Sequence, residues 1–143
     1  RYAALRVIGN SADLRQTPRE DILAFVDAFQ NYMVATYAGV FTQYRDQKVI
    51  IEPAAGGIDD QKIITVKTRV IDPGKPDIKI DFKLRRGKDS DNWLVFDMVA
   101  EGISLLDSKR AELGNLIRQQ GLTSVTALLQ EKAKAPITKP EEK

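Results

Sequence analysis

The chain has 143 residues, with 22 basic and 20 acidic side chains and a net charge of +2, and 43% of its residues are hydrophobic. This composition is typical of a globular domain, and no apolar run approaches the roughly 20 residues that a membrane-spanning helix requires. Because cysteine and histidine are both absent, the sequence excludes cysteine nucleophiles, zinc fingers, His-based triads and most transition-metal sites. The interspersed charges argue against nucleic acid as a partner.

Two helices are predicted at the start of the chain. The first covers residues 1–8 and is stopped by Gly9-Asn10. The second begins at Thr17-Pro18-Arg19-Glu20, a capping box with proline at the first helical position. Apolar side chains then recur at steps of three and four residues and form an aromatic stripe of Ile22, Phe25, Val26, Phe29, Tyr32, Met33, Tyr37, Val40, Phe41 and Tyr44.

Four strands are predicted after these helices. A short strand over residues 48–52 is followed by a flexible connection at residues 53–57 and a long strand over residues 61–71. The face that we expect to be dry in the long strand contains Ile64, Val66, Thr68 and Val70. In the third strand Ile78, Ile80, Phe82 and Leu84 alternate with Lys79, Asp81, Lys83 and Arg85, which indicates one dry and one wet face.

The fourth strand covers residues 92–100 and is apolar on both sides, which is typical of a central strand. Its alternation predicts that Leu94, Phe96 and Met98 share one side and that Trp93, Val95 and Val99 share the other. After Gly102 the pattern becomes helical, Gly121 stops that helix, and Thr123 caps a last helix that reaches about residue 132. Residues 133–143 are predicted to be a disordered tail.

Short turns between successive strands favour antiparallel pairing. The sequence therefore predicts an α+β fold, with a strongly twisted four-stranded antiparallel sheet and helices at both ends of the chain, in a single domain over residues 1–132.

Three short motifs follow the third strand in this order: Asn92-Trp93, Asp97-Met98 and Ala100-Glu101-Gly102. Through these motifs the chain resembles the MlaC family of periplasmic phospholipid carriers, also called toluene-tolerance auxiliary proteins. Arg1-Tyr2-Ala3, Val7-Ile8-Gly9 and residues 109–129 extend the resemblance over nearly the whole chain. It implies an NTF2-like cup with helices on the concave face of the sheet. It also implies further helical sequence ahead of Arg1 and a signal peptide that this chain does not contain.

The resemblance implies a function as well as a fold. The implied protein is a monomer in the periplasm that moves glycerophospholipid between the two membranes and maintains the lipid asymmetry of the outer membrane. Its partners would be an inner-membrane ABC transporter complex with a substrate-binding hexamer and an outer-membrane lipoprotein-porin complex. The lipid would be cargo, with its acyl tails in an apolar cavity and its headgroup exposed, and no cofactor or metal is implied.

Two apolar walls are predicted for this cavity. The sheet wall consists of Val66, Val70, Ile78, Ile80, Phe82, Phe96 and Met98. The helix wall consists of Phe25, Phe29, Tyr32 and Met33. Met33 and Met98 are pliable side chains that suit variable acyl chains. The alternative is that all of these residues form a packed core, which would fit a structural adaptor without a ligand.

A second hypothesis is a small enzyme of the same cup shape that acts on a hydrophobic substrate. Asp97 would be its general base and Tyr32 its acid. The competing interpretation is that Asp97 holds a turn amide, a lysine or an arginine, because a buried carboxylate must be satisfied. Glu101-Gly102 is interpreted as a strand-to-helix junction.

A basic edge is formed by Lys79, Lys83, Arg85, Arg86 and Lys88. It suits anionic headgroups or an acidic partner surface, and an ordinary solvated sheet face is the alternative.

Overall fold

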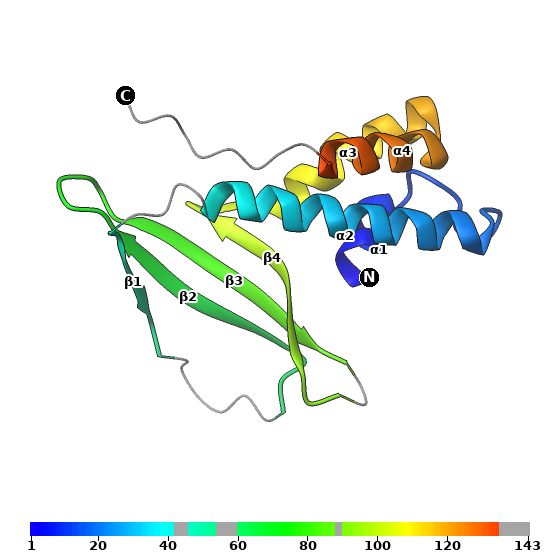
Figure 1. Cartoon of the computed structure of the whole chain (residues 1–143). Helices are drawn as coiled ribbons and strands as arrows, with labels where there is room; N and C mark the ends of the chain where they lie inside the picture. The colour runs from blue at the N-terminus through cyan, green and yellow to red at the C-terminus, as the bar shows by residue number, and fades with distance from the viewer. Residues whose placement is uncertain (42–45, 54–59, 88–89, 135–143) are drawn as a thin grey trace. The chain divides into compact units, whose positions relative to one another are not determined.

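The computed structural model describes residues 1–41, 46–53, 60–87 and 90–134 and, within them, shows four α-helices and a five-stranded antiparallel sheet (Figure 1). The predicted α+β fold with helices at both ends is confirmed. The chain divides into two compact units, which are a helical unit of residues 1–45 and 109–143 and a sheet unit of residues 46–108. The single domain over residues 1–132 stays a prediction, and the predicted tail lies outside the described residues apart from its first two positions.

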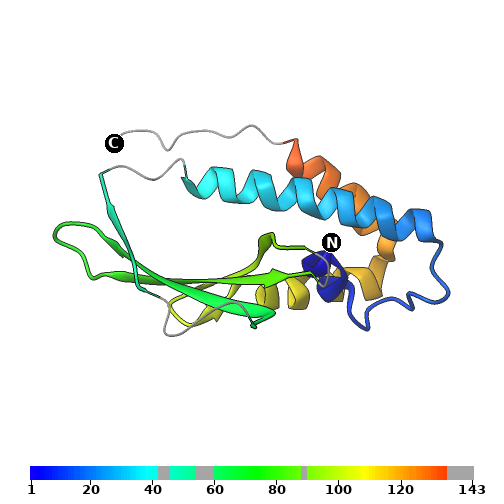
Figure 2. The same ribbon diagram turned by 90° about the horizontal axis from the view of Figure 1, so that it is seen from below.

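The helical unit contains α1 (Tyr2–Ile8), α2 (Arg19–Phe41), α4 (Leu122–Ala133) and most of α3 (Leu105–Gln120). Its α2 packs chiefly against α4, and the two helices lie together in both Figure 1 and Figure 2. Gly121, at φ 88°, separates α3 from α4, as the sequence predicts, but α4 begins at Leu122, so Thr123 lies inside the helix and is not its cap. Among the described residues, the large side chains that are fully buried all belong to this unit, namely Val7, Ile8, Phe25, Leu113, Val125 and Leu129.

The sheet unit contains β1 (Lys48–Ile51), β2 (Ile63–Ile71), β3 (Ile78–Arg86), β4 (Trp93–Ala100) and β5 (Ile103–Ser104). The strands follow one another in chain order across the sheet, and every neighbouring pair is antiparallel. Figure 2 shows their twist. The prediction of four strands missed β5, which pairs with β4 across a two-residue turn and is too short to show an alternating pattern.

One part of the predicted alternation in β4 is wrong. Lys83 of β3 lies opposite Asp97, but the next residue, Leu84, lies opposite Val95, so Phe96 is the extra residue of a β-bulge. The bulge shifts the alternation by one position. Trp93 and Val95 therefore share a face with Met98, whereas Leu94 lies on the opposite face.

None of the described helices is both long enough and apolar enough to cross a membrane.

Candidate functional site

One face of the sheet, called the apolar face here, is built from cross-strand partners of all of the first four strands. Directly paired residues lie on the same side of an antiparallel sheet. The register therefore places these residues together: Val49, Ile51, Ile64, Val66, Thr68, Val70, Ile78, Ile80, Phe82, Leu84, Arg86, Trp93, Val95, Met98 and Ala100.

The apolar face lacks a dry core. Among the described residues from Lys48 to Ser104, no apolar side chain is buried, and the only buried residues are Thr68 and Asp97. Ile51 is 66% exposed, Val95 55% and Ile78 44%. A contiguous apolar surface that stays open to solvent is typical of a ligand groove or an interaction site.

The predicted sheet wall lies on this face with one exception. Val66, Phe82 and Met98 form a row across β2, β3 and β4, and each is half-buried. Val70 lies opposite Ile78, and Ile80 lies between Thr68 and Ala100. The exception is Phe96, whose position in the bulge removes it from the alternating register.

Thr68 is the one polar residue in the middle of the apolar face. Its hydroxyl donates a 2.7 Å hydrogen bond to the carbonyl oxygen of Ile80, its cross-strand partner. This contact satisfies the hydroxyl within the sheet, so the side chain presents its methyl group without an unpaired donor.

The predicted wall left out seven apolar residues that the register adds to the apolar face, namely Val49, Ile51, Ile64, Leu84, Trp93, Val95 and Ala100. The alternation of β3 already contained the signal for Leu84. The faces of β1 and β4 depend on pairing, because a four-residue strand and a bulged strand carry no reliable period.

The predicted helix wall divides into buried and half-buried members. Phe25 and Phe29 are 0% and 5% exposed, and their rings stack with centroids 6.0 Å apart. Tyr32 and Met33 are half-buried. Phe25 and Phe29 thus belong to the core of the helical unit. The side chains of Val40 and Phe41, and the whole of Tyr44, lie outside the described part of the predicted stripe.

Tyr32 has a specific polar partner in the helical unit. Lys109 Nζ donates a 2.9 Å hydrogen bond to the Tyr32 hydroxyl, lies 5.2 Å from the centre of the Tyr32 ring, and is 3.1 Å from a Glu112 carboxylate oxygen. Burial alone would lower the pKa of Lys109, but the hydrogen bonds with Tyr32 and Glu112 outweigh it and raise that pKa above its ordinary value.

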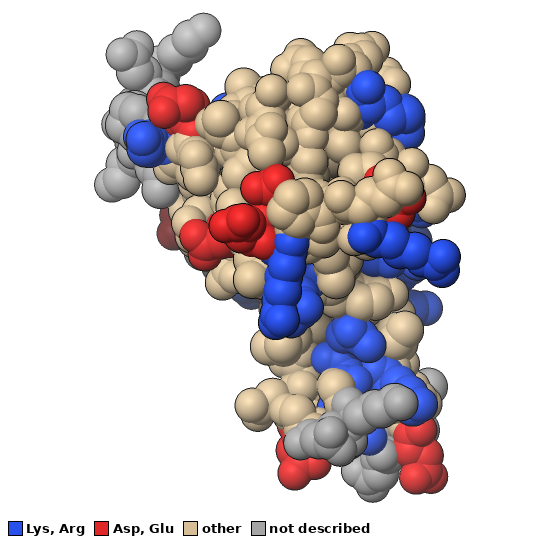
Figure 3. Space-filling model, turned by 90° about the vertical axis from the view of Figure 1, so that its right-hand side faces the viewer, with Lys and Arg blue, Asp and Glu red and all other residues tan. Residues whose placement is uncertain are grey.

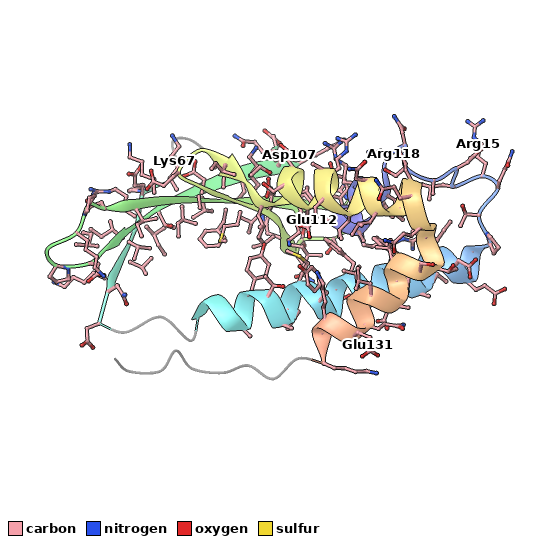
Figure 4. The ribbon with its side chains drawn as sticks, turned by 90° about the horizontal axis from the view of Figure 1, so that it is seen from above. Arg15, Lys67, Asp107, Glu112, Arg118 and Glu131 are labelled. Atoms are coloured by element: carbon pink, nitrogen blue, oxygen red, sulfur yellow. The ribbon has the colours of Figure 1, made fainter. Side chains whose placement is uncertain are left out.

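Asp97 is a buried carboxylate that caps the start of α3. One of its oxygens accepts a 2.6 Å hydrogen bond from the Ser104 hydroxyl, and the other accepts a 2.9 Å bond from the backbone amide of Leu106. Ser104 Oγ in turn accepts a hydrogen bond from the backbone amide of Asp107, which lies in the first turn of α3 (Figure 4). The interpretation that Asp97 holds a turn amide is confirmed, and the arrangement is that of a helix cap.

Glu101-Gly102 is a hairpin turn and not the predicted strand-to-helix junction. Ala100 pairs with Ile103 across it, and both turn residues have positive φ, 50° and 81°. Two successive positive φ values are the requirement of a type I′ hairpin turn. The Glu101 carboxylate accepts a 2.8 Å hydrogen bond from the backbone amide of Lys79, which connects the turn to β3. The carboxylate that caps the start of α3 is that of Asp97.

The opposite face of the sheet is charged. Lys79, Lys83 and Arg85 of the predicted basic edge lie there, together with Lys67, Arg69 and Asp81. Arg86 is an exception, because it pairs with Trp93 on the apolar face and its guanidinium lies 5.0 Å from the centre of the indole ring. Lys88 lies outside the described residues.

Both signs of charge occur on this charged face. Arg69 is 3.4 Å from Asp77 and 3.7 Å from Glu52. Figure 3 shows basic and acidic side chains between uncharged areas on the side of the molecule that it presents. Within the described segments, no group of three or more acidic side chains could hold a metal ion.

Comparisons with known proteins agree on one family. The profile of the family described as MlaC protein matches residues 1–131. The "Intermembrane phospholipid transport system binding protein MlaC" of Haemophilus influenzae is 29% identical over 137 residues, which are 95% of this chain and 63% of that protein. The chain thus spans less than two thirds of the length of this relative.

A solved structure shows the same fold. The phospholipid-binding protein from Ralstonia solanacearum, determined in complex with a phospholipid, superposes with a TM-score of 0.73 at 21% identity. The match covers 92% of this chain and 71% of the other.

Proposed function

The chain belongs to the MlaC protein family, and from this premise we propose that it carries glycerophospholipid through the periplasm. The acyl tails lie against the apolar face, and the headgroup stays in water. The observation that carries this proposal is the apolar face itself, because no apolar side chain described between Lys48 and Ser104 is buried.

The energetics of lipid transfer support an open apolar surface of this kind. Each methylene group left in water costs about 0.8 kcal/mol, so two acyl tails exposed together cost tens of kcal/mol. A row such as Val66, Phe82 and Met98 offers the tails an apolar contact without a charge inside it. Met98 can adjust its shape to acyl chains of different length.

We further propose that the lipid moves between an inner-membrane ABC transporter complex, with its substrate-binding hexamer, and an outer-membrane lipoprotein-porin complex. A carrier between two bilayers has to hold lipid about as well as a bilayer does, since tighter binding would prevent release. This transfer maintains the lipid asymmetry of the outer membrane.

We propose no catalytic step. The enzyme hypothesis assigns the base to Asp97 and the acid to Tyr32. Both oxygens of Asp97 already accept hydrogen bonds that start α3, and the Tyr32 hydroxyl accepts one from Lys109. Each group therefore has a structural partner in its own unit, and no second observation favours catalysis.

Native mass spectrometry of protein purified without detergent from a bacterial host tests the proposal. We expect a near-stoichiometric mass shift that organic extraction identifies as glycerophospholipid. A bare protein mass, or a bound species that is not a lipid, would contradict the proposal.

A matched pair of variants locates the bound lipid. Phe82→Glu places a carboxylate on the apolar face, and Arg85→Glu places one on the charged face of the same strand, opposite the uncharged Ile63 and Leu94. We expect at least a tenfold loss of bound lipid in the first variant and little change in the second, because burying an unpaired carboxylate beside acyl tails is strongly unfavourable. Equal lipid content in both folded variants would show that the apolar face is not the binding surface.

A further inference from the structure

The first strand, β1, is an exposed sheet edge. In the described sheet it is paired only with β2, and Figure 1 shows it at the end of the strand order. Val49, Ile50 and Ile51 are 50%, 37% and 66% exposed. An edge strand of this composition presents unpaired backbone groups together with apolar side chains, which is a template for pairing with another strand.

The direction of the β1 backbone groups follows from one hydrogen bond. The Glu52 amide donates to the Lys67 carbonyl oxygen at 2.9 Å, so Glu52 and Lys67 form a hydrogen-bonded pair in line with the register of β1 and β2. Such pairs alternate along an antiparallel ladder. Lys48 and Ile50 therefore also direct their backbone groups at β2, whereas Val49 and Ile51 direct theirs outward from the sheet.

We propose that β1 pairs with β1 of a second copy of this chain in an antiparallel arrangement centred on Ile50. Val49 then lies opposite Ile51 of the second copy, and these are the residues whose backbone groups point outward. Two such pairs, related by the two-fold axis, form four backbone hydrogen bonds. Lys48 lies opposite Glu52 of the second copy at each end. The apolar centre of the pairing is therefore flanked on both sides by a pair of opposite charges.

This register is favoured over its neighbours by charge and side-chain type. A register that places Val49 opposite Val49 of the second copy still pairs the backbone groups that point outward. However, it brings Asp46 opposite Glu52 and Lys48 opposite Ile50. A shift that places Ile51 opposite itself sets Ile50 against Glu52. Like charges directly opposite one another are destabilising, as is a charge set against an apolar side chain. The register centred on Ile50 avoids both conflicts.

The proposed contact is closed and weak. It uses the same strand from both copies, so it stops at a dimer and does not extend into a fibre. A pair of four-residue strands buries far less surface than the standard interfaces of stable complexes, so we expect association at high micromolar concentration and above. The Glu52 side chain is 46% exposed and its 3.7 Å contact with Arg69 leaves it accessible.

The inference goes beyond the proposed lipid carriage, and it departs from the monomer that the family resemblance implies. Val49 and Ile51 lie on the apolar face, so pairing through β1 would make the apolar faces of two copies continuous.

Sedimentation equilibrium over a wide concentration range at low salt tests the proposal on the full chain, both as purified and after lipid extraction. We expect the average mass to rise toward twice the monomer mass in both preparations. In hydrogen exchange, the amides of Val49 and Ile51 should become protected as concentration rises, whereas that of Ile50 is protected throughout. A monomer at every concentration, or association that disappears with the lipid, would overturn the proposal.

Charge reversal tests the register. Lys48→Glu and Glu52→Lys should each weaken association by roughly three- to tenfold, since each sets like charges opposite one another at both ends, and the double variant should restore it. Val49→Pro removes an outward amide without disturbing the pairing with β2, a position where edge strands tolerate proline, and should abolish association. Association that is unchanged in the single reversals, or not rescued in the double variant, would rule out this pairing.

Discussion

Asp97 and Ser104 are joined by a hydrogen bond of 2.6 Å, in which the Ser104 hydroxyl donates to the Asp97 carboxylate. The second Asp97 oxygen accepts the Leu106 amide. A single carboxylate on β4 therefore fixes both β5 and the start of α3. This contact gives a structural reason for the Asp97 of the motifs that carry the family resemblance, and the hairpin turn at Glu101-Gly102, which lets β5 pair with β4, gives one for the Ala100-Glu101-Gly102 motif.

Asp97→Ala should lower the free energy of unfolding by about 2 to 3 kcal/mol, because it leaves a buried amide and a hydroxyl without their charged acceptor. Urea unfolding followed by circular dichroism measures the change. The control is Asp107→Ala, since Asp107 is exposed in the first turn of α3 and should cost well under 1 kcal/mol. Equal losses in the two variants would show that Asp97 is not the cap that its geometry indicates.

Trp93 is the only tryptophan of the chain and lies on the apolar face beside Arg86. If the acyl tails lie against this face, phospholipid with brominated acyl chains should quench Trp93 fluorescence, whereas the same lipid without bromine should not. The measurement is a titration of lipid-extracted protein. Stoichiometric binding of brominated lipid without quenching would place the tails away from Trp93.

Lys109→Gln should lower the stability of the helical unit by about 1 kcal/mol at neutral pH, since the variant loses a charged hydrogen bond to Tyr32. The pKa of Lys109 is raised above 10.5 in the folded protein, so its stabilising contribution is complete below pH 10.5 and declines as the pH rises through the folded pKa. Denaturant unfolding at pH 7 and at increasing alkaline pH measures the difference between the two proteins. A difference that grew with alkaline pH would contradict this linkage.

Phe25→Ala should lower the free energy of unfolding by about 3 to 5 kcal/mol, the range for a fully buried phenylalanine in a packed core. Met33→Ala is the comparison, because Met33 is half-buried and should cost less. Thermal or urea unfolding of lipid-extracted protein gives both values. A loss under 1 kcal/mol for Phe25→Ala would mean that this side chain borders an open space and supports its assignment to the lipid-binding wall.

Local patterns predicted most of the secondary structure. The alternation of Ile78, Ile80, Phe82 and Leu84 fixed the two faces of β3, because side chains in a regular strand point to opposite sides at every step. The three- and four-residue spacing of α2 likewise predicted that Phe25 and Phe29 are covered. The two faces of a strand and the covered side of a helix depend only on neighbours in the sequence. The same holds for the short motifs that indicated the family.

Tertiary pairing decided what the local patterns could not. The bulge at Phe96 exists only relative to β3. The alternation of β4 alone therefore wrongly predicted that Phe96 lies on the same face as Met98. The short strand β5 and the Glu101-Gly102 turn likewise depend on pairing with β4. Periodicity says which side of an element is covered but not what covers it. The structure therefore was needed to show that Phe25 is buried in the helical unit while no apolar side chain described on the apolar face of the sheet is buried, since burial is set by contacts between residues far apart in the chain.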